Sequence, residues 1–393
     1  MNPSSARQSV LFAYGFRPFF LGAGVWSLAM ISLWLYLLNS ADSTLDAMRS
    51  PLWHGHEMLY GFIGASAAGF LLTASPNWSR KPALTGTPLK LLFLSWLLGR
   101  FSMLCSPWLP AWLVAGGDLL FCIALVATTT PTLWNTGNKV HRIFPLLLAL
   151  LALGNLLYHG QFVGIWQESA QRGLYVGIDA IVFFLVMVGG HIMPMFTRNA
   201  LANTEMLPPI PIKPALEIAG AVTLTAIVLS DLYDPYNAVG GVILCVAALV
   251  QAWRLSLWHT LKTLKIPILW VLHVGYAWLV IGLMLRGISQ TLHWLPPTAA
   301  LHALTIGAMG LFTLGIMGRV SLAHTGRPLQ ASFSFALTFY LIIAAVCIRV
   351  FAILIWPMQA ITLSALLWIG AFALFIVNFA TALTQPRPDG LPG

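Results

Sequence analysis

The sequence predicts an all-α, polytopic membrane protein with about twelve transmembrane helices and both termini on the cytoplasmic side. Of its 393 residues, 59% are hydrophobic and only 8% are charged, whereas a soluble domain carries roughly 25% charged residues. Such a chain cannot cover a water-exposed surface, so its apolar excess must face the lipid bilayer. Phosphate-binding loops and hydrolase nucleophile motifs are absent from the sequence. We therefore expect residues 1–393 to form a single transmembrane domain.

Apolar segments long enough to cross a membrane recur along the whole chain. Crossing the ~30 Å hydrocarbon core takes about 20 helical residues. Connections rich in proline, such as the one around Pro208 and Pro209, separate several of these segments. The expected spans are 16–38, 52–74, 88–105, 108–128, 143–160, 172–196, 214–230, 237–256, 266–287, 298–320, 331–355 and 357–382.

Lysine and arginine fall in alternate connections and so predict the orientation. The N-terminal tail carries Arg7 and Arg17, and the C-terminal tail carries Arg387, whereas the intervening loops carry mainly acids such as Asp42 and Asp231. Because basic loops stay in the cytoplasm, both termini of this multi-pass protein are expected inside. The net charge of +9 is then a topology signal, and no nucleic-acid partner is expected.

Ten histidines are many for a membrane protein, in which ionisable residues are costly and usually mark function. The predicted topology sorts six of them by depth. Those near the outer side are His54, His56, His159 and His302, and those nearer the inner side are His191 and His273.

The second and tenth expected spans share a pattern that predicts a haem site. In each, a histidine (His56 or His302) precedes glycines five, eight and thirteen residues later. Such glycines allow close helix packing, or the approach of a flat macrocycle. A b-type haem would take one imidazole from each span: His302 from one, and either His56 or His54 from the other. Because His54 and His56 point about 200° apart on a helix, both cannot bind one metal.

Other ionisable residues have candidate roles beside these histidines. Glu57 could orient an imidazole or relay protons. Arg286 and Arg349 near the outer helix ends, with Arg100, could pair with haem propionates or simply reach the interface. His191 and His273 could hold a second haem or form a polar network. The deeper acids Asp118 and Asp179 could be protonated packing residues or members of a proton path.

Several long motifs are distributed along the chain. They are GFRPFF at 15–20, WHGHEM at 53–58 with GF at 61–62, PMFTRN at 194–199, HVGY at 273–276, HALTIG at 302–307 and RVSLAHTGRP at 319–328. Through these motifs the chain resembles the NnrS family of bacterial membrane proteins along nearly its whole length. The resemblance implies a haem- and copper-containing protein of the bacterial cytoplasmic (inner) membrane, linked to denitrification and nitric oxide stress. With the histidines at two depths, one or two b-type haems are expected.

A fainter similarity connects the chain with the catalytic subunit of haem-copper oxidases and nitric oxide reductases. That subunit also has twelve helices, and histidines on its helices 2 and 10 hold a low-spin haem. The motif beginning at His54 resembles its helix 2 motif, and His302 is similarly placed on helix 10. Its copper ligands on helices 6 and 7 have no counterpart here. A copper site would need other ligands, for which His54, His159 and His191 are the candidates.

The resemblance and the histidines together lead us to expect an oxidoreductase of the nitric oxide reductase type. It would reduce two nitric oxide molecules to nitrous oxide, with Glu57 supplying protons and with a quinol or a periplasmic electron carrier as electron donor. One alternative is a sensor or metal-binding accessory protein that binds nitric oxide without turnover. A secondary transporter is the other alternative, although the six-helix duplication typical of transporters is absent from the sequence.

Overall fold

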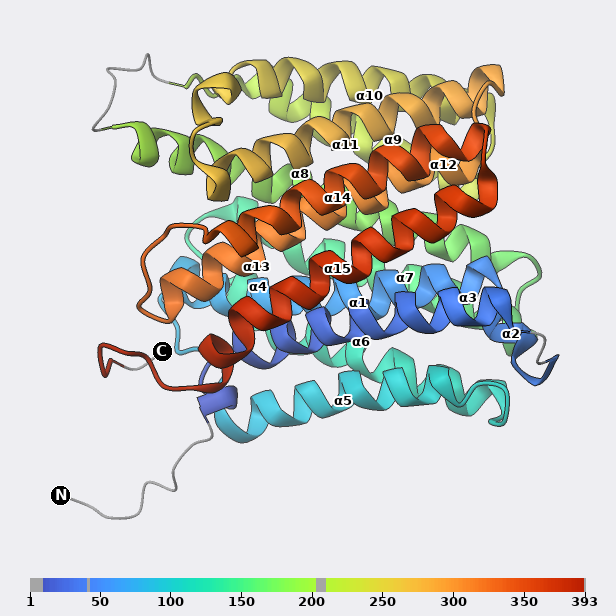
Figure 1. Ribbon diagram of the computed structural model, residues 1–393, viewed down its shortest axis with the longest axis horizontal. Helices are drawn as coiled ribbons and strands as arrows, with labels where there is room; N and C mark the ends of the chain where they lie inside the picture. The colour runs from blue at the N-terminus through green and yellow to red at the C-terminus, as the bar shows by residue number, and fades with distance from the viewer. Residues whose placement is uncertain (1–9, 41–42, 203–209, 392–393) are drawn as a thin grey trace. The chain divides into compact units, whose positions relative to one another are not determined.

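The computed structural model describes residues 10–40, 43–202 and 210–391, and every regular element in these ranges is helical (Figure 1). The elements are η1 (Val10–Phe12), α1 (Phe16–Asn39), η2 (Ser43–Leu45), α2 (Asp46–Arg49), α3 (Pro51–His56), η3 (Glu57–Ile63), α4 (Gly64–Ser79), α5 (Gly86–Leu104), α6 (Ala111–Trp134), η4 (Lys139–Arg142), α7 (Ile143–Phe162), α8 (Ser169–Leu201), α9 (Pro214–Tyr233), α10 (Ala238–Ser256), η5 (Thr260–Thr263), α11 (Pro267–Leu292), α12 (Pro297–His302), η6 (Ala303–Gly310), α13 (Leu311–His324), α14 (Phe333–Phe351), η7 (Ala352–Leu354) and α15 (Pro357–Thr384).

The predicted fold class is confirmed. Within the described ranges, eleven helices are long and apolar enough to cross a membrane. The expected segment 88–105 corresponds to α5, which is 19 residues long and is not among the eleven. It carries Lys90 and Arg100, which lower its hydropathy.

Contacts between the two ends of the chain indicate that α5 is the twelfth span. Nη1 of Arg17, the second residue of α1, donates to the carbonyls of Ala382 (3.2 Å), Leu383 (3.0 Å) and Gln385 (3.0 Å) at the end of α15. The start of α1 and the end of α15 therefore lie at the same membrane face. An even number of crossings must separate them, and α5 added to the other eleven satisfies this condition.

Two predicted helix ends are wrong because the helices continue through a proline. The second span was expected to end at 74 and the fourth at 128, but α4 contains Pro76 and α6 contains Pro131. Each proline lies three residues before the end of its helix, at Ser79 or Trp134. A proline removes one backbone hydrogen bond from a helix. Both helices nevertheless continue for three residues beyond their proline, so the proline does not mark the end of either helix.

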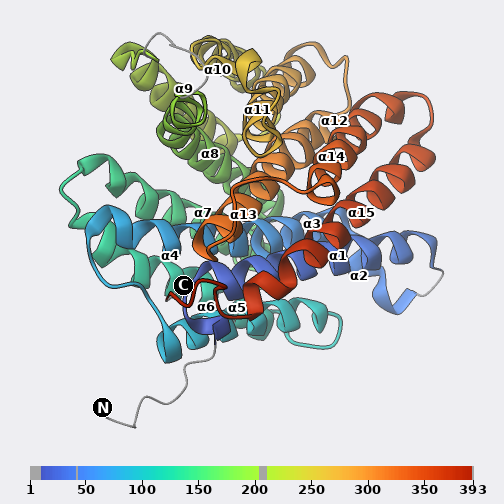
Figure 2. The same cartoon turned by 60° about the vertical axis from the view of Figure 1, so that its left-hand side comes forward.

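Backbone contacts divide the chain into two compact units. Unit 1 comprises the described parts of 1–177, 316–329 and 372–393, and unit 2 comprises those of 178–315 and 330–371. In unit 1, α6 packs against α5 and α7, and α1 packs against η3 and α4 (Figure 1). In unit 2, α10 packs against α9 and α11, and η6 packs against α11 and α14 (Figure 2).

The second and tenth spans share an unusual backbone as well as a sequence pattern. Each changes from α-helix to π-helix directly after its histidine, His56 before η3 and His302 before η6. π-Helical segments are rare and occur frequently at functional sites. These two spans are also largely enclosed by protein, with 89% and 72% of their most apolar window buried. The change to π-helix singles out the regions next to His56 and His302, whereas burial alone does not, since α8 is 83% buried by the same measure.

Candidate metal centre

Polar side chains from four spans meet inside unit 1, where almost none of their surface is exposed. The fraction exposed is between 0 and 3% for each of them. Polar groups this deeply buried are tolerated only when they pair with one another. The members of this buried cluster are His56 at the end of α3, Glu57 at the start of η3, Arg100 on α5, Asp118 on α6, and Asn155 and His159 on α7.

Asp118 is the centre of the cluster. Its Oδ2 atom lies 3.0 Å from Nε2 of His56 and 3.0 Å from Nε2 of His159, and it accepts a 2.7 Å hydrogen bond from Nδ2 of Asn155. Its Oδ1 atom forms an ion pair with Arg100. One possible ligand atom each from His56, Asp118 and His159 lies within 4.8 Å of the other two. Two imidazoles and a carboxylate form a donor set that suits copper, zinc or iron.

Glu57 belongs to the same cluster and contacts Nδ1 of His56, whereas Asp118 contacts Nε2 of that ring. Nη1 of Arg100 donates to both of its oxygens at 2.8 Å, and Nε1 of Trp26 donates to Oε2 at 2.9 Å. Oε1 also lies 3.0 Å from Nδ1 of His56. Metal-binding histidines usually donate their second ring N–H to a carboxylate or a carbonyl, which fixes the orientation of the ring. Glu57 can perform this role for His56.

The charges of the cluster favour an additional cation. Glu57 and Asp118 contribute two negative charges when ionised, and Arg100 contributes one positive charge. The excess negative charge lies in a buried region, where an unbalanced charge costs several kcal/mol. A metal cation or a protonated imidazole would balance it.

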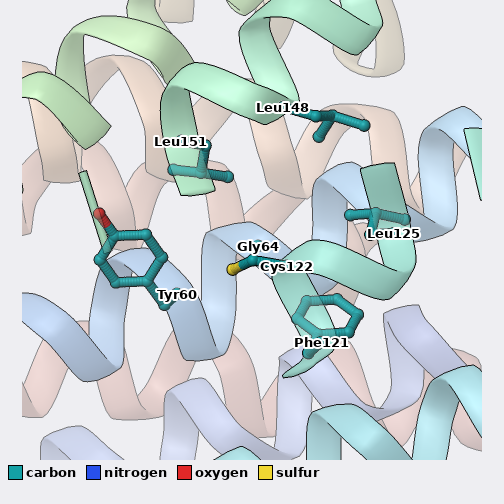
Figure 3. A pocket seen from close by; sticks show the side chains of 7 residues that line it. All are labelled: Tyr60, Gly64, Phe121, Cys122, Leu125, Leu148 and Leu151. Atoms are coloured by element: carbon teal, nitrogen blue, oxygen red, sulfur yellow. The ribbon is translucent and has the colours of Figure 1, made fainter. Parts of the chain in front are cut away.

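A small apolar cavity lies beside the cluster (Figure 3). Cys122 links the two regions, because its Sγ atom lies 3.6 Å from Nδ2 of Asn155. Tyr60 links them a second time, since its ring centroid lies 4.8 Å from that of His56. Figure 3 shows Tyr60 and Leu125 on opposite sides of Cys122. The lining residues are Tyr60, Gly64, Phe121, Cys122, Leu125, Leu148 and Leu151.

The structure brings together three of the residues predicted from the sequence: His56, Glu57 and His159. His54 lies elsewhere, because its ring stacks on Trp34 with a centroid distance of 4.2 Å. The two helix 2 histidines therefore have separate surroundings, as their helical spacing predicted.

The two inner histidines also have different surroundings. His273 is fully buried, with Nε2 3.0 Å from Oγ1 of Thr197 and Nδ1 3.1 Å from Oγ1 of Thr260. His191 is exposed on α8. Both ring nitrogens of His273 thus lie within hydrogen-bonding distance of a hydroxyl group. This is the arrangement expected for a polar network rather than for a haem ligand.

Besides His273, three further predicted haem residues lie in unit 2, and two of these three have features that suit the cofactor. Nδ1 of His302 is 2.5 Å from the carbonyl of Thr298, so it donates there and the lone pair of the ring is on Nε2. Arg349 is 8% exposed, and its Nη1 has no hydrogen-bond partner among the described residues. It lies on α14, which packs against the helix that carries His302. By contrast, Arg286 is engaged by two aspartates.

The glycines that follow His56 and His302 pack mainly against protein side chains. This is the alternative to packing against the face of a haem. A Cβ atom at Gly61 would lie 2.5 Å from Trp26, and one at Gly307 would lie 2.8 Å from Trp278. Gly64 is different, because a Cβ atom there would meet only ordinary contacts of 3.6 Å and 3.9 Å. The fit of a haem therefore depends on His302 and Arg349 rather than on the glycines.

Sequence reasoning did not find the centre of the cluster. From the sequence, Asp118 was predicted to be a packing residue or a member of a proton path, and Arg100 to be a possible partner of haem propionates. No role was predicted for Asn155. One signal was available: Asn155 and His159 are four residues apart and so share one face of a helix. The pairing of that face with Asp118 depends on the packing of α6 against α7.

Comparison with known proteins agrees with the sequence motifs. The family described as NnrS protein matches residues 10–387, which is nearly the whole chain. The search of curated proteins gave no match. Membership of this family supports a membrane protein related to nitric oxide. On the match across residues 10–387, the chain belongs to the NnrS family.

Proposed function

We propose that this protein is a haem- and copper-containing redox protein of the bacterial cytoplasmic membrane that reduces nitric oxide to nitrous oxide, in denitrification or in defence against nitrosative stress. The observation that carries the proposal is the convergence of His56, Asp118 and His159 on one buried point. Family membership supplies the link to nitric oxide.

In this proposal, His56, Asp118 and His159 hold the copper. This assignment moves His56 from the haem, where the glycine spacing put it, to the second metal. Both ring nitrogens of His56 face carboxylates of the cluster, which suits a ligand oriented by Glu57. Arg100 balances one of the two carboxylates, and the metal ion balances the other.

The haem part of the proposal rests on the family and on two residues of unit 2. His302 would be an axial ligand through Nε2, since Nδ1 donates to Thr298. The partnerless Nη1 of Arg349 would pair with a propionate. Bound haem and copper would supply a place for nitric oxide to bind and the transfer of single electrons.

The overall reaction requires protons as well as electrons. Two nitric oxide molecules, two electrons and two protons give one nitrous oxide and one water. The electrons would come from a quinol or from a small periplasmic carrier. Within the chain, Glu57 is the carboxyl group that would supply protons to the site, and its Oε1 accepts from Nδ1–H of His56, 3.0 Å away. Nε2 of the same ring is the atom assigned to the metal, so the imidazole orients Glu57 and does not itself carry the proton.

The cavity beside the cluster suits the substrate. Nitric oxide is small and apolar enough to partition into the bilayer, and apolar cavities stay free of water. Leu125, Leu148 and Leu151 line the cavity and exclude water from it. Cys122 and Tyr60 connect it with the metal ligands. We infer that this cavity holds nitric oxide before it reacts.

One observation favours a second candidate function, the binding of nitric oxide without turnover. Both ring nitrogens of His56 are already engaged by other members of the cluster. A centre whose polar atoms are satisfied in this way could serve a sensor or an accessory protein.

Gas analysis separates the two functions. The purified full-length protein in lipid nanodiscs is reduced chemically and mixed with nitric oxide, while nitric oxide and nitrous oxide are followed together. We expect one nitrous oxide for every two nitric oxide molecules over repeated turnovers. The matched control is His293→Asn, which changes a histidine outside the cluster. The φ angle of His293 is 56°, a backbone conformation that asparagine tolerates. A change in the optical spectrum without nitrous oxide would support the sensor and contradict the reductase.

A further inference from the structure

A second buried group of charges lies in unit 2 and plays no part in the proposed reaction. It consists of Asp179 on α8, Asp231 on α9 and Arg286 on α11. Their exposed fractions are 4%, 1% and 3%. Nη1 of Arg286 donates to Oδ1 of Asp179 at 2.9 Å, and Nη2 forms an ion pair with Asp231.

The charges of this group do not balance. Two ionised aspartates and one arginine leave one excess negative charge in a region shielded from water. Such a charge is expensive in the interior of a membrane protein. The charged groups with the largest effect on Asp179 are Asp231 and Arg286.

The other charged groups of the neighbouring helices do not compensate for the excess. Arg254 on α10 is paired with Glu217 on α9. Asp234, just beyond α9, is half-buried and would add negative charge. The missing positive charge must therefore come from something bound to the two aspartates.

The orientation of the two carboxyl groups indicates what is bound. Oδ2 of Asp179 is buried and accepts no hydrogen bond from any donor in the described residues. The carboxyl group of Asp231 lies within hydrogen-bonding reach of the Asp179 carboxyl group. Two ionised carboxylates repel each other, whereas a carboxylic acid donates a hydrogen bond to a carboxylate. A single proton would satisfy the buried oxygen and cancel the excess charge.

We propose that Asp179 and Asp231 form a proton-binding site, in which the pair holds one proton and Arg286 balances the remaining carboxylate. Asp231 lies two residues before the end of α9 at Tyr233, so the site can exchange its proton with water at that membrane face. The proposal does not depend on the proposed reaction with nitric oxide.

The two buried groups differ in what supplies the extra positive charge. In unit 1, Arg100 also bridges two carboxylates, but two imidazoles surround Asp118 and can bind a metal ion. Among the described residues, no histidine is paired with Asp179, Asp231 or Arg286 in the hydrogen bonds and ion pairs that define this group. The donor set of unit 2 consists of oxygens alone, held against a guanidinium group, and this arrangement suits a proton better than a metal cation.

Infrared spectroscopy of the full-length protein tests this site. A protonated carboxyl group has a carbonyl stretching band that a carboxylate lacks. We expect the wild-type protein to show this band at neutral pH, and we expect Asp179→Asn or Asp231→Asn to remove it. The asparagine amide keeps the hydrogen-bonding role of the protonated acid, so at least one of the two variants should fold. The control is Asp46→Asn, which changes an exposed aspartate paired with Arg49 and should leave the band intact.

Two results would overturn the proposal. One is a carbonyl band that is absent from the wild-type protein, or that is unchanged in both variants. The other is the loss of folded protein in both variants, because it would mean that both aspartates are required in their charged form. Melting curves recorded beside the spectra distinguish these cases.

Discussion

His56 and His159 each place Nε2 3.0 Å from the same oxygen, Oδ2 of Asp118. The two histidines come from α3 and α7, and they are 103 residues apart in the sequence (159 minus 56). Because the site joins distant segments, its geometry depends on the packing of several helices. The predictions below test the parts of this arrangement separately.

Removing the positive charge of Arg100 should destabilise the protein strongly. Arg100 is 1% exposed and balances both Glu57 and Asp118. Leaving buried carboxylates without their partner costs about 3–5 kcal/mol. Arg100→Met should therefore lower the thermal unfolding midpoint clearly. The control, Arg49→Met, removes an exposed pair with Asp46 and should change stability by less than about 1 kcal/mol. Equal effects of the two substitutions would contradict a buried charge cluster.

Replacing Glu57 should weaken the metal site without abolishing it. Glu57 contacts Nδ1 of His56 rather than the atoms that would bind the metal. Loss of such a supporting carboxylate typically weakens metal binding about 10–100-fold. We expect Glu57→Gln to bind copper more weakly by this factor and to consume nitric oxide more slowly, as measured by metal titration and a gas electrode. Unchanged binding and turnover would remove Glu57 from the site.

Filling the cavity should slow the entry of nitric oxide. A Cβ atom at Gly64 would lie 3.6 Å from the Leu59 carbonyl oxygen and 3.9 Å from Phe121, so Gly64→Ala fits without a clash and narrows the cavity. We expect a slower rate of nitric oxide binding in stopped-flow experiments, with stability retained. The control is Gly116→Ala on α6, where a Cβ atom meets nothing within 4 Å. The role of the cavity is refuted if both variants bind nitric oxide at the wild-type rate.

The histidines that hold the haem and the copper should be separable by single substitutions. His302→Ala should lose haem or change its spin state in protein that still inserts into the membrane. His56→Ala, by contrast, should lose copper and keep the haem. The optical spectrum and the metal content of each variant provide the measurement. A full haem content with an unaltered spectrum in His302→Ala would exclude this residue as a ligand.

Reporter fusions should show an even number of crossings. Arg17 joins the start of α1 to the end of α15, so both ends lie at one face. The basic loops predict that this face is cytoplasmic. A reporter fused after Asp389 should therefore report the cytoplasm, and one inserted near Asp234 should report the outer side. The same result at both positions would contradict twelve crossings.

The spans could be predicted from the sequence because apolar length determines them directly. The second expected span, 52–74, began within one residue of Pro51, and the twelfth, 357–382, began at the first residue of α15. The ends near Pro76 and Pro131 were wrong, since both helices continue past their proline, which is therefore no reliable stop signal.

The site was only partly predictable for a different physical reason. His56, Glu57 and His159 stood out because ionisable residues are unusual in apolar segments. Their common partner Asp118 could not be identified, because helical periodicity gives the face of a residue but not the helix that the face will meet. The repeated pattern after His56 and His302 indicated a shared feature, which the structure shows to be a change to π-helix.

Metal analysis of purified variants tests the central claim most directly. The account predicts that the wild-type protein contains copper, and that His159→Ala and Asp118→Asn each lose it while the protein remains folded. The control His293→Asn should retain the wild-type copper content. Iron in place of copper at the same ligands would correct the identity of the metal but leave the site in place. Full copper content in both His159→Ala and Asp118→Asn would show that the metal is bound elsewhere and would contradict the account.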